Sequence, residues 1–254
     1  MAQNERSFRV EAVVLRHRDH GEADRILTLF SRQRGKLHAI AKGVRKLRSR
    51  KAGHLEPFTR VTLQLARGRD FLIVTQADTQ NAYLPIKDDL FKTGQAAYVV
   101  ELIDRFLYAD ESEHPEVFRL LVETLERIAV DTDPWLALRY YEVRLLDLLG
   151  FRPHLFECAN CGEEIQAVDQ FFSPLAGGVL CPKCGHGLPG AWPIPVDVLR
   201  HFRHFQRSSY AEASRAKPAP AVREQLENLL QRYFTYLLER ELNSPGFLKQ
   251  IRTP

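Results

Sequence analysis

The sequence predicts an α+β fold in which a small amino-terminal β-barrel precedes a mainly helical part that carries a cysteine-rich insert. Apolar residues repeat every two positions up to about residue 80 and with a helical period from about residue 88. Two Cys-x₂-Cys pairs interrupt the helical pattern. We therefore expect a barrel at 1–82, a first helical part at 83–151, the cysteine insert at 152–190 and a second helical part at 191–254.

Five short stretches of the first 80 residues show the alternation of apolar and polar side chains that is typical of half-buried strands. They are 8–15, 25–31, 36–42, 61–66 and 71–75. The Arg-Gly-Arg-Asp sequence at 67–70 predicts a tight turn that joins the last two strands into a hairpin. Five strands at mostly hairpin spacing predict a small closed barrel of the OB-fold type, with 43–57 as a long basic connection.

The later apolar stripes have helical spacing and predict the core-facing sides of helices. The helical segments are expected around 96–107, 115–128, 133–150, 195–207 and 222–237, the last ending before Ser244. Asp133 followed by Pro134 is a helix start signal, and Gly150 is a stop signal. Residues 208–220, which contain two prolines, are expected to form a linker.

The cysteines form two pairs, Cys158 with Cys161 and Cys181 with Cys184, and 19 residues separate the pairs. This is the spacing of a four-thiolate zinc ribbon, in which each sulfur lies about 2.3 Å from the metal. Reduced thiols in an intracellular chain favour metal ligation over disulfides. Four sulfurs fill the tetrahedron and leave no position for a reactive water, so we expect one structural Zn²⁺ per chain.

The segment between the pairs contains apolar residues that predict a short hairpin over a minimal core: Phe171, Phe172 and Val179. Gly162 and Gly185 each follow a pair, and we expect both to adopt positive φ at the turn. His154 and His186 flank the pairs, but four sulfurs make a further ligand unnecessary.

Basic side chains are concentrated near the amino end. Residues 1–80 contain 17 Lys or Arg and 8 Asp or Glu, whereas the rest of the chain contains 19 and 24. Such a cluster is either a solvated loop surrounded by salt or a surface for a polyanion, and we favour the polyanion because it relieves the self-repulsion. The predicted phosphate-binding residues are nine cations with no acidic residue between them: Arg32, Arg34, Lys36, Lys42, Arg45, Lys46, Arg48, Arg50 and Lys51.

No catalytic constellation is evident in the sequence. A phosphate-binding P-loop, a nucleophile elbow and a His-Glu-x-x-His motif are all missing, and the four cysteines are assigned to the metal. Asp19, Glu22 and Asp24 beside Arg25 would suit a metal-dependent nuclease, but a solvated turn between two strands is the simpler interpretation. With no run of 18 apolar residues and no signal-peptide pattern, we expect a non-enzymatic cytoplasmic protein without membrane contact.

The predicted binding is dominated by the nucleic-acid backbone. The stretch 31–57 contains no Phe, Tyr or Trp, and Phe30, Phe58 and Phe71 are expected in the core rather than as stacking platforms. Sequence-tolerant binding of single and double strands follows. Six to nine phosphate contacts would give a log–log salt slope of roughly −4 to −8.

Several short fragments of the sequence, taken together in their order and spacing, make the chain similar to the RecO family of bacterial recombination mediators. The fragments lie at 11–16, 21–30, 35–36, 41–46, 55–58, 97–102 and 148–153. The resemblance spans essentially the whole chain. It implies binding of single- and double-stranded DNA by the barrel, which places the DNA-binding role on the nine basic residues given above.

The resemblance also implies partners. Members of the family anneal complementary strands and act with RecR, and usually RecF, to load RecA on DNA coated by single-stranded-DNA-binding protein (SSB). They capture the acidic C-terminal tail of SSB on the helical domain, and association with the nucleoid follows from DNA binding. The alternatives are a zinc-ribbon RNA-binding factor, which would display stacking aromatics, and a nucleic-acid-modifying enzyme, which would show turnover.

Overall fold

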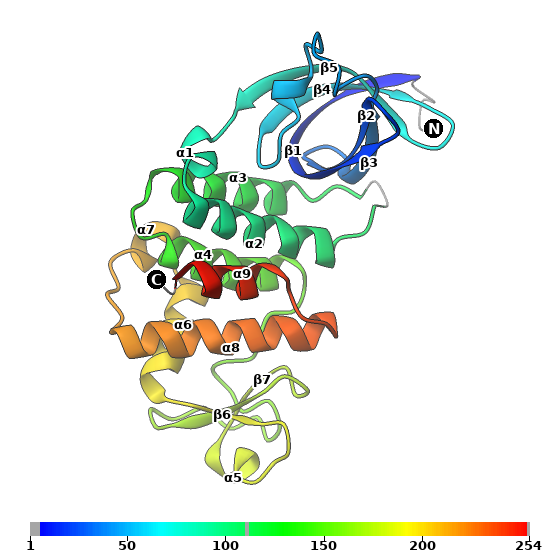
Figure 1. Ribbon diagram of the computed structural model, residues 1–254. Coiled ribbons are helices and arrows are strands. Elements are labelled where there is room, and N and C mark those ends of the chain that lie inside the picture. The colour runs from blue at the N-terminus through cyan, green and yellow to red at the C-terminus, as the bar shows by residue number, and fades with distance from the viewer. Residues whose placement is uncertain (1–5, 110–111, 253–254) are drawn as a thin grey trace. The chain divides into compact units, whose positions relative to one another are not determined.

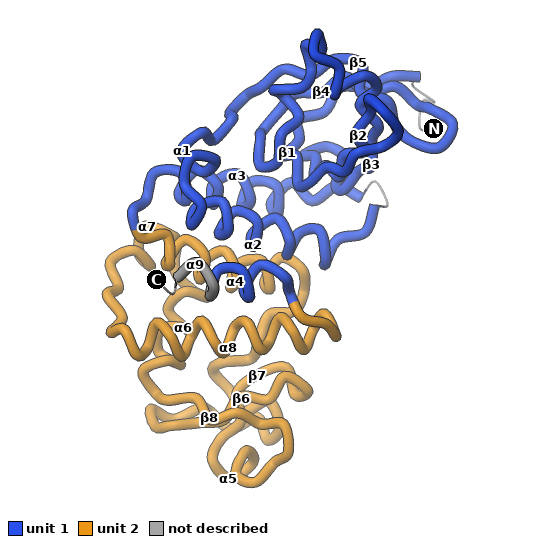
Figure 2. Tube along the Cα trace, in the orientation of Figure 1, with its two compact units in different colours: residues 1–132, 242–254 blue, residues 133–241 orange. Residues whose placement is uncertain are grey.

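The computed structural model describes residues 6–109 and 112–252, with side chains as far as Leu248 (Figure 1). These residues form two compact units (Figure 2). Unit 1 contains residues 1–132 and 242–254, and unit 2 contains residues 133–241. In the described part of the chain, no helix is both long and apolar enough to span a lipid bilayer.

Unit 1 begins with the predicted closed barrel of five strands, in the order β1-β2-β3-β5-β4. The strands are β1 (Ser7–His20), β2 (Asp24–Ser31), β3 (Gly35–Ala41), β4 (Arg60–Arg67) and β5 (Leu72–Asn81). Neighbouring strands are antiparallel except β3 and β5, which pair in parallel and close the barrel. Alternate side chains such as Leu27, Leu29 and Leu63 point inward and are fully buried, which explains the two-residue period of the sequence.

Two strands are longer than their hydrophobic pattern predicts. β1 continues to His20 because its exposed end still pairs with β2, where Asp19 lies opposite Arg25. β5 likewise continues to Asn81, which lies opposite Arg60 of β4. Hydrogen bonds between the strands hold these ends although their side chains face water. Apolar alternation in the sequence cannot identify such exposed strand residues.

Four helices complete unit 1: α1 (Leu84–Lys87), α2 (Leu90–Phe106), α3 (Pro115–Val130) and α9 (Ser244–Arg252). α9 lies beyond the predicted end of the last helix, and it packs against α2. Glu101 of α2 caps it, because its carboxylate accepts hydrogen bonds from the backbone N–H groups of Asn243 and Ser244, both at 2.9 Å. A carboxylate at a helix amino end is electrostatically favourable, so one residue of α2 fixes the start of α9.

Unit 2 contains the cysteine insert and, outside it, four helices among the described residues. The helices are α4 (Trp135–Leu148), α6 (Val196–Arg207), α7 (Tyr210–Ala213) and α8 (Pro220–Leu238). The insert contains β6 (Gln170–Ser173), β7 (Gly178–Leu180) and α5 (Pro182–Gly185), and β8 (Trp192–Ile194) follows just after its expected end at residue 190. The predicted hairpin is present, with Phe172 opposite Val179, and β8 pairs with the other edge of β6.

The start and stop signals of α4 act as the sequence indicates, with a shift of one residue. The Asp133 carboxylate accepts from the N–H of Trp135 at 3.3 Å, and the helix begins at Trp135 rather than at Pro134. At its other end Gly150 has a φ of 82°. The N–H of Phe151 donates to the carbonyl of Leu146 at 2.8 Å, which completes a Schellman motif.

The segment 208–220, predicted as a linker, contains the short helix α7. Ser209 and Glu212 form a capping box, in which the Glu212 backbone N–H donates to Ser209 Oγ and the Glu212 carboxylate accepts from the Ser209 N–H. The Ser and Glu at this spacing were therefore a start signal. Their helix is only one turn long, too short to produce an apolar stripe.

A buried ion-pair cluster lies in unit 2. Arg139 and Glu142 are 2% and 0% exposed, and Arg139 Nη2 donates to Glu142 Oε1 at 2.7 Å. The other terminal nitrogen of Arg139 lies 3.0 Å from the carboxylate of Glu227 on α8. One arginine thus bridges α4 and α8 inside the apolar core.

Candidate metal centre and nucleic-acid interface

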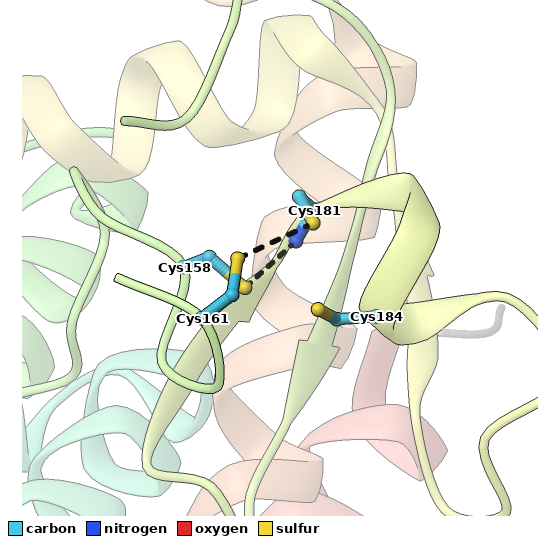
Figure 3. A group of neighbouring side chains, drawn as sticks. All are labelled: Cys158, Cys161, Cys181 and Cys184. Carbon is cyan, nitrogen blue, oxygen red and sulfur yellow. Dashed lines mark hydrogen bonds between the residues drawn. The ribbon is translucent and has the colours of Figure 1, made fainter. Parts of the chain in front are cut away.

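The four cysteines converge from two loops, one before β6 and one at the start of α5 (Figure 3). Their sulfurs all lie within 4.8 Å of one another, and Sγ of Cys161 lies 3.9 Å from Sγ of Cys181. A tetrahedral ion with bonds of about 2.3 Å would place its sulfurs about 3.8 Å apart. The four thiols therefore fit such an ion. Among the described residues, neither His154 nor His186 belongs to this group.

The surrounding protein favours the thiolate form at Cys158 but not at Cys161. Burial disfavours the Cys158 thiolate, but backbone N–H groups, including that of Cys181 at 3.3 Å, outweigh it and lower the pKa of Cys158 to about 6. The backbone at Glu163 favours the Cys161 thiolate, but the adjacent Cys158 sulfur raises the pKa of Cys161 to about 12. Four neighbouring thiolates therefore require a cation among them.

The two glycines of the insert have different roles. Gly162 has a φ of 76°, as predicted for the turn after the first pair. Gly185 is in α5 and does not adopt positive φ, so that expectation was wrong. A Cβ at Gly185 would lie 2.5 Å from Cβ of Phe171, so the position needs glycine because β6 packs closely against it.

α6 holds the first cysteine loop through Arg203. Its Nε donates to the carbonyl of Leu155 at 2.7 Å, and Nη2 donates to that of Ile165 at 3.4 Å. The guanidinium of Arg207 stacks on Phe156 at 3.3 Å. These contacts fix the backbone on both sides of Cys158 and Cys161 without involving the metal ligands.

The basic loop, residues 42–57 between β3 and β4, is fastened to the barrel at its first end by the β1–β2 turn. The N–H of Gly43 donates to the Asp24 carboxylate at 2.7 Å, and the N–H of Arg45 donates to the carbonyl of Ala23 at 2.9 Å. Arg45 also pairs with Asp19 at 3.4 Å. The carboxylates at the ends of β1 and β2, on either side of this turn, therefore brace the loop.

The second end of the basic loop is fastened to β5. Lys51 Nζ donates to the carbonyl of Val74 at 3.0 Å. The His54 Nδ1 atom lies 2.8 Å from Thr79 Oγ1, and a 3₁₀ turn, η1 (Ala52–His54), places this histidine. The loop is held at both ends, so its centre projects from an ordered base.

The basic loop carries four cations that have no carboxylate partner among the described residues. Lys42, Lys46, Arg48 and Arg50 are exposed, and no ion pair joins them to a carboxylate within 6–109 and 112–252. Together with Arg45 and Lys51, they gather six of the nine predicted cations in one segment. Such a segment attracts phosphate groups strongly.

Arg32 and Arg34 lie elsewhere, in the turn between β2 and β3, which is at the opposite end of these strands from the basic loop. Arg32 is 3.8 Å from the Glu11 carboxylate. Arg34 stacks on Phe8 at 4.1 Å. The nine predicted residues therefore do not form one surface.

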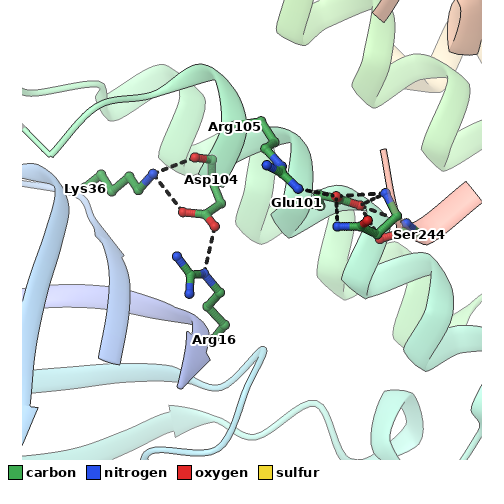
Figure 4. A network of polar contacts seen from close by, with 7 residues as sticks. Arg16, Lys36, Glu101, Asp104, Arg105 and Ser244 are labelled. Carbon is green, nitrogen blue, oxygen red and sulfur yellow. Dashed lines mark hydrogen bonds and ion pairs between the residues drawn. The ribbon is translucent and has the colours of Figure 1, made fainter. Parts of the chain in front are cut away.

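Lys36 is buried and faces α2 (Figure 4). Its ammonium lies 2.7 Å from the Asp104 carboxylate and donates to the carbonyl of Leu107 at 3.0 Å, which satisfies the end of α2. Arg16 donates to the same carboxylate at 2.8 Å. Lys36 thus fastens the barrel to α2 within unit 1, and we leave it out of the interface proposed below.

The Asp104 cluster predicts an acid-sensitive contribution to the stability of unit 1. Burial alone would raise the pKa of Asp104, but hydrogen bonds from Lys36 and Arg16 outweigh it and lower the pKa below its ordinary value. The stabilisation is therefore complete above the unfolded-state pKa of about 3.9 and is lost as the pH falls through the lower folded-state value. We expect Asp104→Asn to destabilise unit 1 at pH 7 and to reduce its loss of stability below about pH 4.

Unfolding of unit 1 can be followed by hydrogen exchange of the barrel amides as a function of pH. Asp78→Asn is the matched control, because Asp78 is an exposed carboxylate on β5. A wild type and an Asp104→Asn variant with the same pH dependence would contradict this role of the cluster.

Two of the three aromatic residues predicted for the core are buried there. Phe30 and Phe58 are buried, and Phe71 is half-buried. Phe58 has a φ of 67°, directly after the basic loop. Neither buried ring is available for stacking on a base.

Comparison with known proteins assigns the chain to a family. The family model described as "Recombination protein O N terminal" matches residues 5–83, and "Recombination protein O C terminal" matches residues 87–245. The chain is 39% identical over 248 residues to the DNA repair protein RecO of Roseiflexus sp. (strain RS-1), covering 98% of this chain and 87% of the relative.

Two further relatives give the same result. The DNA repair protein RecO of Dehalococcoides mccartyi (strain CBDB1) is 34% identical over 245 residues, covering 96% of each chain. That of Desulforudis audaxviator (strain MP104C) is 35% identical, covering 97% of this chain and 98% of the relative. Both family models match, and the three relatives align with nearly the whole chain, so this chain belongs to the RecO family of DNA repair proteins.

Proposed function

We propose that this chain is a non-enzymatic recombination mediator that binds single- and double-stranded DNA through the basic loop of its barrel and anneals complementary strands. The observation that carries the proposal is a segment of six cations, four of which have no carboxylate partner among the described residues, held at both ends by the barrel. Annealing needs no reacting side chain, because neutralised phosphates let two polyanions approach and loose contacts let bases search for partners. The interface contains Lys42, Arg45, Lys46, Arg48, Arg50 and Lys51.

The metal in this proposal is one Zn²⁺ bound by Cys158, Cys161, Cys181 and Cys184. With four thiolate ligands it supplies structure rather than a reactive water. The convergence of the four sulfurs supports this assignment. The ion would hold an insert whose own apolar core is small.

The partners proposed with this function follow from family membership. We assign to the chain an interaction with RecR, capture of the acidic C-terminal tail of SSB, and loading of RecA on SSB-coated DNA as the outcome. DNA binding by the basic loop is the part of this sequence of events that the geometry of unit 1 supports directly.

A fluorescence annealing assay with SSB-coated complementary strands tests the proposal. The test variant carries Glu in place of four cations: Arg45, Lys46, Arg48 and Arg50. We expect annealing to be lost and DNA affinity to fall by at least about 100-fold at low salt, since four contacts are replaced by repulsion. The remaining log–log salt slope should be smaller in magnitude by about 3 to 4.

The matched control reverses four cations of unit 2 that lie on its surface: Arg200, Arg215, Lys217 and Arg240. Its net charge equals that of the test variant, so a general charge effect would appear in both. Unchanged DNA binding by the test variant, or a wild-type affinity that does not depend on salt, would refute the interface. Turnover of the nucleic acid would refute the non-enzymatic role.

A further inference from the structure

Leu47 is the only large apolar side chain that the described barrel residues 6–81 leave exposed. It is fully exposed, whereas the other large aliphatic and aromatic side chains of this region are buried or half-buried. A single exposed leucine is common on protein surfaces. Its place in the basic loop makes this one informative.

Two consecutive turns present Leu47 to the solvent. The N–H of Lys46 donates to the carbonyl of Gly43 at 3.2 Å, and the N–H of Ser49 donates to the carbonyl of Lys46 at 2.8 Å. Leu47 follows Lys46 in the second turn, between the fastened residues Arg45 and Lys51. Its exposure is therefore set by hydrogen-bonded geometry rather than by a loose chain end.

The neighbours of Leu47 are cations on both sides. Arg45 and Lys46 precede it, and Arg48 and Arg50 follow it. A DNA strand whose phosphates contact these cations brings its bases within reach of the leucine side chain. The basic loop contains no Phe, Tyr or Trp, and its other large aliphatic side chains, Val44 and Leu55, are buried, so Leu47 is the only large aliphatic group it offers to a base. Leucine is among the side chains that proteins insert between base steps.

We infer that Leu47 is a base-contacting wedge that inserts between neighbouring bases of the strand held by the flanking cations. The inference rests on the DNA binding proposed above. The contact tolerates any sequence, because every base has an apolar face. It also separates stacked bases, which leaves their pairing edges accessible to a complementary strand.

The test uses oligonucleotides that contain 2-aminopurine, whose fluorescence rises when the base is unstacked. Leu47→Asn is the main variant because asparagine has nearly the same size but is polar, and Leu47→Met retains an apolar side chain. We expect Leu47→Asn to bind single-stranded DNA about three- to tenfold more weakly, as partial burial of one leucine implies. It should lose the fluorescence increase, and Leu47→Met should retain it.

The log–log salt slope separates the wedge from the phosphate contacts, and it should be the same in wild type and Leu47→Asn. Leu175→Asn is the matched control, since Leu175 is 85% exposed in the turn between β6 and β7 and has no cation beside it. Equal affinity and equal fluorescence for Leu47→Asn and wild type would overturn the inference while leaving the DNA-binding proposal intact. Wild-type protein that fails to bind DNA would instead refute that proposal.

Discussion

Replacing Cys158 with serine should release the metal and unfold the cysteine insert while the barrel stays folded. Cys158 is buried, and its sulfur accepts the N–H of Cys181, so its loss removes a ligand and a contact between the two cysteine loops. Metal binding contributes about 10–16 kcal/mol to the folding of small zinc peptides. The buried apolar groups of the insert, chiefly Phe172, Val179 and Leu180, are too few to replace it.

Metal analysis and hydrogen exchange measure this effect. We expect about one zinc ion per wild-type chain and none in Cys158→Ser, with protection lost in β6 and β7 and kept in the barrel strands. Ala159→Ser is the matched control, because it adds a hydroxyl group to the same loop without removing a sulfur. A metal-free wild type with full protection of β6 and β7 would contradict a structural metal.

Replacing Arg139 with methionine should destabilise unit 2 by about 3–5 kcal/mol, because it leaves buried carboxylates without their counter-charge. Glu142 is fully buried, the Glu227 side chain is 15% exposed, and Arg139 contacts both. The double variant Arg139→Met with Glu142→Leu should recover part of this loss, because one of the two carboxylates is removed as well.

Tryptophan fluorescence during urea unfolding reports this change selectively, because Trp135 and Trp192 are the only tryptophans of the chain and both are in unit 2. Arg200→Met is the matched control. Arg200 pairs with Asp197 at the same i, i+3 spacing, but the pair is exposed and is expected to contribute at most about 1 kcal/mol. Equal destabilisation by Arg139→Met and Arg200→Met would contradict the role of burial.

Periodicity predicted the barrel and the longer helices because burial on one face leaves a regular trace in the sequence. The same reasoning could not find α9. Its position depends on Glu101, which lies 143 residues before Ser244 and which carries no sequence signal for capping a distant helix. The burial of Arg139 was equally hidden, because a charged residue inside an apolar stripe looks like a residue at the edge of the stripe.

The candidate site was predictable in part. The cysteine spacing alone placed four sulfurs together, because each pair lies on one tight turn. Charge clustering in the sequence located the basic loop, but it could not show which of the nine basic side chains point to the same surface. Lys36 lies on the face of β3 opposite to Leu37 and Ala39, which point into the barrel core, and only the tertiary structure shows that its ammonium meets the end of α2. Arg32 and Arg34 are close in sequence to the loop, but the intervening strand β3 carries them to the far end of the barrel.

The route of the chain through the two units has a consequence for their folding. The chain leaves unit 1 after α3 and returns to it at α9, and both helices pack on α2. If unit 2 unfolds while unit 1 persists, residues 133–241 become a loop with pinned ends rather than a free polymer. Holding both ends together lowers the conformational entropy of the unfolded residues 133–241, and this entropy loss grows only slowly with the length of the loop. The unfolded form of unit 2 is therefore less favourable, and its folded form is stabilised. The Glu101 carboxylate therefore stabilises helices that it never touches.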